Sequence, residues 1–214
     1  MKRHDIIIGF LIFMFLLFLV IPLTSQWFFT TADRWPYVGG FVKFFLFASL
    51  GDLLSHRIVH KNYAVVGFIY KAVIWGFIGV VIVMIFPIFH NGVIHLQSIG
   101  LLPFAHVRLM TAFFTSVLMN VTFAPTMMAF HRVSDHYIEH SIKHKEHRLN
   151  QSVQMIDWSM FVNTVLFKMI PLFWIPAHTI TFMLPGGYRV LFASILGVLL
   201  GLFLGLAKTK PRKV

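Results

Sequence analysis

Mainly apolar runs alternate with short polar segments along the chain. The first run extends from Ile6 to Ala32 without a charged residue, the second from Tyr37 to His60, and the third from Tyr63 to about Phe89. A helix needs about 20 mainly apolar residues to cross the hydrocarbon layer of a bilayer, so each run predicts one membrane-spanning helix. The first run ends without the small-residue cleavage site of a signal peptide, and we retain it as an additional N-terminal span within residues 1–36. Residues 90–103 carry two glycines and a proline and are expected to form a loop.

The second half of the chain predicts three more spans. The fourth runs from about His106 to Phe130, the fifth begins near Met155, and the sixth runs from about Gly187 to Ala207. Residues 131–154 form the one long polar segment, a His-rich inner loop or helix. Prolines at positions 171, 176 and 185 interrupt the sequence before the sixth run. Because proline disrupts a helix interior, we expect a short broken or re-entrant helix there.

Composition fixes the class of protein. Hydrophobic residues make up 58% of the 214 residues and charged residues 12%, which leaves too few polar side chains to cover a water-soluble globule. We therefore expect an all-α, polytopic integral membrane protein with about six spans in a single domain, residues 1–214. The absence of cysteine excludes disulfides, Cys-ligated metals and thiol catalysis. The lipid bilayer is the expected partner, and no nucleic acid is expected.

The basic residues predict the orientation of the spans. Twelve of the 18 Lys and Arg residues fall at one set of span ends, whereas only Arg34 lies in a loop on the opposite side. Loops rich in Lys and Arg remain in the cytoplasm, so both termini are predicted to be cytoplasmic, in a bacterial inner membrane or an organelle membrane. The twelve residues are Lys2, Arg3, Arg57, Lys61, Arg132, Lys143, Lys145, Arg148, Lys208, Lys210, Arg212 and Lys213.

Two opposite charges interrupt the second and third apolar runs, Asp52 in FLFASLGDLLSH and Lys71 in VVGFIYKAVIWGF. In an antiparallel hairpin that turns at Lys61 and Asn62, the two residues would lie at the same depth. An unpaired charge within the bilayer costs at least about 2.5–3.5 kcal/mol. We therefore expect a buried contact between Asp52 and Lys71. The alternative is that each side chain reaches the membrane surface or pairs elsewhere.

Histidines form a second candidate site. His136, His140 and His144 follow i, i+4, i+8 spacing and share one face of a helix. Imidazoles at i and i+4 can share a divalent metal ion, which supports an alternative function as a metal-binding membrane protein or a desaturase- or hydroxylase-like metalloenzyme. Against it, the chain has neither an adjacent His-His pair nor an HEXXH motif. The other interpretation is a hydrated helix near anionic headgroups. We infer no catalytic residue and no cofactor beyond this candidate metal.

A third pattern is a glycine stripe. Gly197, Gly201 and Gly205 form two overlapping GxxxG units in the sixth run. Such units favour close helix packing, either within the monomer or in a homo-oligomer.

Three segments resemble a known family of membrane proteins. FVKFFLFASLGDLLSHRIVH is similar to the N-terminal signature of the Mpv-seventeen and twenty-two kilodalton peroxisomal membrane protein family, in which a helix carries a Gly-Asp pair. WIPAHTITFMLPGGYRVLFASILGVLLGLFLG resembles the terminal pattern of that family, and NVTFAP lies between the two. The resemblance covers about residues 41–206. The chain departs from the pattern where Ile175 separates Trp174 from Pro176, and in its extra N-terminal span and its His-rich segment.

The resemblance implies a small multispan helical bundle, a weakly selective channel or a membrane-homeostasis protein whose solute or ion is unknown. The positions that match the family's motifs are Gly51, Asp52, Trp174, Pro176, Phe182, Pro185 and Arg189. Together with Lys71, they are the candidate polar pathway. Pro176 and Pro185 would free backbone carbonyls that line a solute route or would simply end helices. Arg189 would hold an acid or a lipid phosphate at the outer face, or serve as an interfacial anchor.

Overall fold

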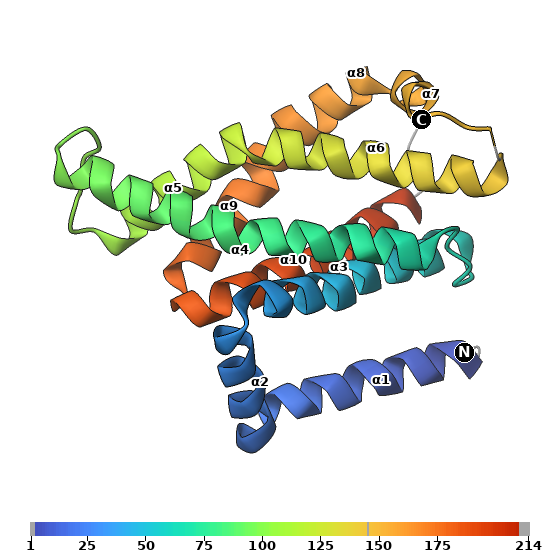
Figure 1. Ribbon diagram of the computed structural model, residues 1–214, viewed down its shortest axis with the longest axis horizontal. Helices are drawn as coiled ribbons and strands as arrows, with labels where there is room; N and C mark the ends of the chain where they lie inside the picture. Colours follow the sequence, from blue (N-terminus) through green and yellow to red (C-terminus); the bar gives the residue numbers. More distant parts are fainter. Residues whose placement is uncertain (1–2, 145, 210–214) are drawn as a thin grey trace.

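The computed structural model describes residues 3–144 and 146–209, and the regular structure within these ranges is entirely helical (Figure 1). In chain order the helices are α1 (Arg3–Val20), α2 (Pro22–Arg34), α3 (Pro36–His60), α4 (Phe68–Ser98), α5 (Arg108–Thr122), α6 (Ala124–Lys143), α7 (Leu149–Met155), α8 (Trp158–Met160), the π-helix η1 (Phe161–Trp174), α9 (Ile175–Met183) and α10 (Gly186–Thr209). The predicted all-α class is confirmed.

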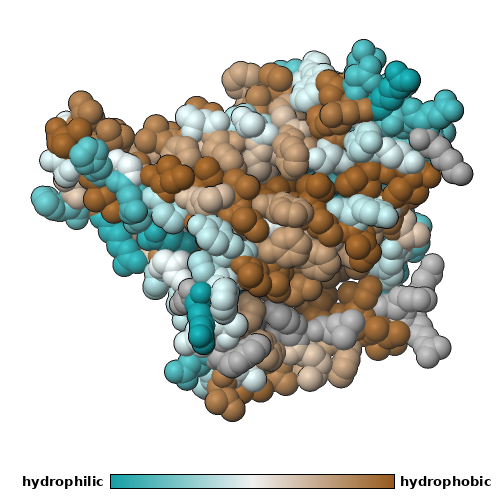
Figure 2. Space-filling model, viewed as in Figure 1, coloured by the Kyte–Doolittle hydropathy of each residue, from teal (hydrophilic) through white to brown (hydrophobic). Residues whose placement is uncertain are grey.

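Four helical segments are long and apolar enough to cross a membrane. They are α3, α4, the combined α8, η1 and α9 (Trp158–Met183), and residues Gly186–Phe203 of α10. A fifth is obtained if α5 and α6, which meet at a bend of 46°, count as one span. The expected number of six is not confirmed. Figure 2 shows hydrophobic residues across the middle of one face and hydrophilic residues gathered toward its ends, as expected for helices in contact with lipid.

The N-terminal apolar run does not form one straight span. The helix ends at Val20, Ile21 adopts an extended conformation, and Pro22 begins α2, which runs across the direction of α1 in Figure 1. Proline fits the first turn of a helix, where its missing N–H removes no hydrogen bond, so Pro22 favours a new helix start. The beginning of α1 is held to the end of α3, because Arg57 makes a two-pronged ion pair with Asp5.

Two further boundaries differ from the sequence-based expectation. α4 continues to Ser98 through most of the predicted loop 90–103, and α6 continues to Lys143 through half of the polar segment 131–154. The predicted break before the last span is also not confirmed. The helix continues through Pro171 and Pro176, with Pro171 inside the π-helix and Pro176 in the first turn of α9. A π-helical stretch changes the register of backbone hydrogen bonds, which is one way a helix accommodates a proline.

Glycines bring α3 into close contact with α4 and α10. A methyl group on Gly51 would lie 2.6 Å from the carbonyl oxygen of Gly197, and one on Gly201 would lie 2.5 Å from that of Gly51. On the opposite side of α3, a methyl group on Gly40 would lie 2.7 Å from the carbonyl oxygen of Gly79. The glycine stripe of α10 therefore packs within the monomer, one of the two uses that the sequence left open.

The start of α1, the α3–α4 loop and the end of α6 lie at one end of the bundle in Figure 1. We call it the inner end, because the sequence predicts that it faces the cytoplasm; the α4–α5 and α9–α10 connections lie at the outer end. Of the twelve residues behind that prediction, Lys2, Lys145, Lys210, Arg212 and Lys213 lie outside the described residues. Between the two ends, the core is filled by buried side chains that include Phe44, Ile82, Phe86, Met119 and Phe182.

Candidate functional site

Toward the inner end, Asp52 of α3 is bound by Trp75 of α4, beside polar groups of α6. Its Oδ2 accepts a hydrogen bond of 2.7 Å from Nε1 of Trp75, and the Trp75 ring lies 4.1 Å from the ring of His131, centroid to centroid. Nε2 of His131 lies 3.7 Å from Oδ2 of Asp135. We call these residues, together with Lys71 and Glu139, the inner cluster. A hydrogen bond to a charged group contributes about 1.5–3 kcal/mol, so the Trp75 hydrogen bond offsets part of the cost of burying the Asp52 carboxyl group.

The predicted contact between Asp52 and Lys71 is not formed. The Lys71 ammonium lies 3.7 Å from Oε2 of Glu139, whose other carboxylate oxygen accepts a hydrogen bond of 2.8 Å from Lys143. The physical reason is the length of α6, which extends along α4 and brings a carboxylate to the face of α4 that carries Lys71. The broader expectation, that these charges face protein groups rather than lipid, holds for both residues. The alternative of pairing elsewhere is therefore the correct one.

Nearer the middle of the bundle, a polar seam joins α5 to α9. The side-chain Nδ2 of Asn120 lies 3.1 Å from Nδ1 of His178 and donates to the backbone oxygen of Ser116 at 2.8 Å. The Ser116 hydroxyl donates to the backbone oxygen of Ile175 at 2.7 Å. Asn120 and Ser116 have no exposed surface, and His178 stacks on Trp174 with ring centroids 5.2 Å apart. Buried polar groups of this kind are stable only when their hydrogen bonds are made, as they are here.

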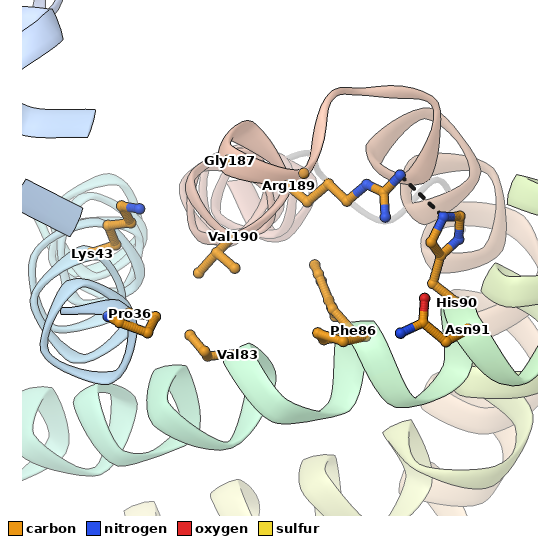
Figure 3. A pocket seen from close by; sticks show the side chains of 11 residues that line it. Pro36, Lys43, Val83, Phe86, His90, Asn91, Gly187, Arg189 and Val190 are labelled. Atoms are coloured by element: carbon orange, nitrogen blue, oxygen red, sulfur yellow. Dashed lines mark hydrogen bonds between the residues drawn. The ribbon is translucent and has the colours of Figure 1, made fainter. Parts of the chain in front are cut away.

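Toward the outer end, α3, α4 and α10 border an open-sided cavity of about 310 Å³ (Figure 3). We call it the outer cavity. Its polar and charged lining comes from Lys43 on α3, His90 and Asn91 on α4, and Arg189 on α10. Its apolar walls include Val83, Phe86 and Val190, and the glycines that begin α10 complete one side. Among the described residues that line the cavity, none is acidic.

Arg189 anchors the end of α9 and borders the outer cavity. Its Nε donates to the backbone oxygen of Leu184 at 3.0 Å, and its Nη2 donates to that of Phe182 at 3.2 Å. These two carbonyls lie in the last turn of α9 and directly after it, where backbone oxygens lack intrahelical donors. Nη2 also lies 3.3 Å from Nε2 of His90. Arg108 donates to the neighbouring backbone oxygen of Met183, so two guanidinium groups stabilise the same helix end.

The remaining candidates from the sequence occupy different places. Phe182 is 1% exposed and packs against the rings of Phe86 and His90, two residues that line the outer cavity. Trp174 lies beside the polar seam through its stacking on His178. Pro176 and Pro185 are exposed at the starts of α9 and α10, where proline belongs by its geometry. The pathway residues thus divide between the two ends and the middle of the bundle.

The histidine rings of the predicted His-rich face stack on one another and do not point toward a common centre. The rings of His136 and His140 lie 3.9 Å apart and nearly parallel, and Nδ1 of His140 bonds the backbone oxygen of His136. Within residues 3–144 and 146–209, no group of three or more His, Asp or Glu side chains is arranged to hold a metal ion.

Outside the spans, Nε2 of His147 lies 2.7 Å from the Ser152 hydroxyl. Desolvation and the imidazoles of His140 and His144 lower the pKa of His147.

Sequence reasoning missed the partners that complete each cluster. His131, Asp135 and Glu139 recur every four residues, a helical face that becomes visible only if the helix is extended beyond Phe130. His90 was assigned to a loop, which concealed its place opposite Arg189. For Asn120 and His178 the sequence contains no pairing signal, because they lie 58 positions apart.

Neither a protein-family model, nor a curated protein, nor a solved structure matches the chain.

Proposed function

We propose that the chain is an integral membrane protein whose bundle provides a route for a small solute or ion. The inner cluster and the outer cavity form the two ends of this route, and the polar seam is its middle. On α4, His90 follows Lys71 by nineteen positions. At a rise of about 1.5 Å per residue, the two levels are about 28 Å apart, close to the thickness of a bilayer's hydrocarbon layer of about 30 Å.

The observation that carries the proposal is the succession of polar side chains inside an otherwise apolar bundle. The Asp52 carboxylate, the Asn120–His178 pair and the Arg189 guanidinium occur at three levels, each bound by protein groups. Ionisable groups at membrane depth are costly, and in membrane proteins they mark solute and ion pathways. The resemblance to a family with weakly selective channels supports the same function.

On this proposal, two buried aromatic rings close the route. Phe86 is 2% exposed and Phe182 is 1% exposed, and their ring centroids lie 5.0 Å apart between the outer cavity and the polar seam. Passage therefore requires these two rings to move. Apolar constrictions of this kind gate channels by excluding water.

We further propose that both termini face the cytoplasm, in a bacterial inner membrane or an organelle membrane. The common position of the α3–α4 loop and the end of α6 supports this orientation, because both carry Lys or Arg residues.

Planar bilayers with purified protein test the proposal. Wild-type protein is expected to raise conductance above that of protein-free bilayers. Asp52→Asn removes one negative charge beside the route; at about 10 Å in water such a charge is worth about 0.4 kcal/mol, so the cation-to-anion permeability ratio should fall about twofold. Asp157→Asn is the matched control. Asp157 is exposed and caps α8 through a bond to the Met160 amide, a role that asparagine also fills.

Silent bilayers with folded wild-type protein would contradict the proposed route. If wild-type protein and the Asp52→Asn variant conduct with the same reversal potential, the inner cluster is not part of the route.

A further inference from the structure

Two buried polar atoms of the inner cluster have no hydrogen-bond partner among the described residues. They are Nε2 of His131 and Oδ1 of Asp135. Nε2 of His131 lies 3.7 Å from the other carboxylate oxygen of Asp135, which is too long for a hydrogen bond. Buried polar atoms are nearly always bonded, so this pair needs an explanation. A protonated imidazole donates from both ring nitrogens and bonds a carboxylate strongly, so one added proton would supply the bond that these two residues lack.

The charges around His131 leave two carboxylates without an ion pair to Lys or Arg. The charged groups that face this imidazole are Asp52 of α3, Lys71 of α4, and Arg132 and Asp135 of α6. Lys71 is paired with Glu139, and Arg132 is exposed. The carboxylates of Asp52 and Asp135 remain, and they repel each other inside the bundle. Acidic groups that interact in this way bind protons as one unit, and one proton shared with the imidazole relieves the repulsion.

Trp75 supports both charges that such a proton creates. Its indole N–H donates to Asp52 at 2.7 Å, and its ring lies 4.1 Å from the ring of His131. The N–H group stabilises a carboxylate, whereas the negative face of an indole stabilises a cation that lies over it. The position of Trp75 therefore suits an aspartate and an imidazolium side by side.

Proton-binding side chains lead from this site to the inner end. On α3, His56 and His60 follow Asp52 in steps of four residues, which places the three on one helical face. The two imidazole rings lie 4.4 Å apart, and His60 is exposed in the last turn of α3. Imidazoles exchange protons in the physiological pH range, and successive Asp, Glu and His side chains carry protons in membrane pumps and transporters.

We propose that the ion carried by the route is the proton, and that Asp52, His131 and Asp135 bind it at the inner end. This inference rests on the proposed function and names the ion. Uptake of one proton converts the imidazole of His131 to an imidazolium that bonds Asp135, and release of that proton restores the neutral ring. Farther along the route, the next imidazoles are His178 in the polar seam and His90 at the outer cavity.

Planar bilayers with the purified full chain test the proposal. The salt is equal on both sides, and the two sides differ in pH. Only protons and hydroxide then have a concentration gradient, so a proton current gives a reversal potential that follows the pH difference. Wild-type protein is expected to show this potential. The measurement needs no substitution, so it remains decisive even if a variant in the buried cluster fails to fold.

Two variants assign the proton to this site. Asp135→Asn and His131→Gln each remove a proton-binding group and retain a polar side chain. A positioned proton-transfer group typically contributes about 100-fold or more to a rate, so each variant should lower the proton current at least about tenfold. Asp157→Asn and His95→Gln make the same changes at exposed positions outside the site, and both should leave the current unchanged.

The outcomes separate this inference from the route itself. A current whose reversal potential ignores the pH difference would overturn the proton as the ion and leave the route to another solute. Silent bilayers with folded wild-type protein would overturn the route and this inference together. A proton current of wild-type size in folded His131→Gln and Asp135→Asn would show that the proton does not pass through these residues.

Discussion

Replacing Gly51 by alanine adds a methyl group where the backbones of α3 and α10 lie closest. That methyl carbon would lie 2.6 Å from the carbonyl oxygen of Gly197 and 2.9 Å from the Cα of Val198. Both neighbours are backbone atoms, which cannot rotate away as a flexible side chain can. The two helices must therefore separate locally or the substituted residue must distort.

The cost can be worked from these distances. Favourable contacts between carbon atoms lie at about 3.5–4.0 Å, so the helices must move apart by roughly 1 Å. Overpacking of this kind costs about 1–3 kcal/mol. Alanine is favoured over glycine within a helix by about 0.5–1 kcal/mol, which offsets part of the loss. We expect Gly51→Ala to lower the free energy of unfolding by about 0.5–2 kcal/mol, measured by reversible denaturant titration in detergent micelles.

Other glycines provide matched controls. Gly201→Ala should destabilise similarly, because its methyl group would lie 2.5 Å from the Gly51 carbonyl oxygen. Gly197→Ala belongs to the same stripe, but its methyl group would lie 3.4 Å from the Cα of Ala48, an ordinary contact, and should be tolerated. Gly92→Ala meets no atom within 4 Å and should stabilise α4 slightly. The double variant at 51 and 201 should lose less than the sum of the single losses, because one separation relieves both clashes.

Equal stability of Gly51→Ala and Gly92→Ala would refute this packing of α3 on α10. So would a Gly197→Ala variant that is destabilised as strongly as Gly201→Ala.

Two other predictions concern the polar seam and the His-rich segment. Asn120→Ala should lower the free energy of unfolding by about 1–3 kcal/mol, since it leaves the buried Nδ1 of His178 without its partner. The control is Asn163→Ala, because Asn163 is exposed. Equal stability of the two variants would contradict the polar seam. The pKa of His147 is lowered in the fold, so its stabilising contribution is present above the unfolded pKa of about 6.5 and is lost as pH falls through the lower folded value. NMR titration of the imidazole checks this, and a pKa above about 6.5 would contradict the packing of His147 against the neighbouring imidazoles.

The sequence was most informative where local pattern and packing agree. α3 was expected from Tyr37 to His60 and is observed from Pro36 to His60. The glycine stripe of the sixth run was expected to favour close helix packing, and its Gly201 does so against Gly51 of α3. In both cases the signal is local. An apolar run bounded by polar residues determines where the helix begins and ends, and the absence of a side chain determines how closely two helices approach.

The inner cluster shows what a sequence pattern leaves out. Equal depth on two helices places Asp52 and Lys71 at one level, but it does not decide toward which neighbour each side chain points. Lys71 points toward α6, because the helix after Phe130 continues and brings Glu139 within 3.7 Å. Whether Lys71 pairs with Asp52 or with Glu139 depends on the path of α6 after its bend, and tertiary packing determines that path.

The prolines were misleading for a different reason. Pro171 and Pro176 each remove a backbone donor, which favours a break when a helix is considered alone. Within the bundle, helix 158–183 packs against α5, and the Ser116 hydroxyl binds the Ile175 carbonyl across that contact. Support from a neighbouring helix can keep a proline-containing helix continuous, and such support cannot be deduced from the segment itself.

The length of α4 gives the outer surface its form. Its 31 residues extend about 46 Å, longer than a hydrocarbon layer of about 30 Å, and its last turns and the start of α5 form a rigid ledge at the outer end of the bundle. Gln97 holds this ledge together through bonds to Thr111 and to the backbone of Pro103. The connecting residues 99–107 are thereby held on a firm support, and the exposed side chains of Ile99, Leu101 and Phe104 give this end of the bundle an apolar surface.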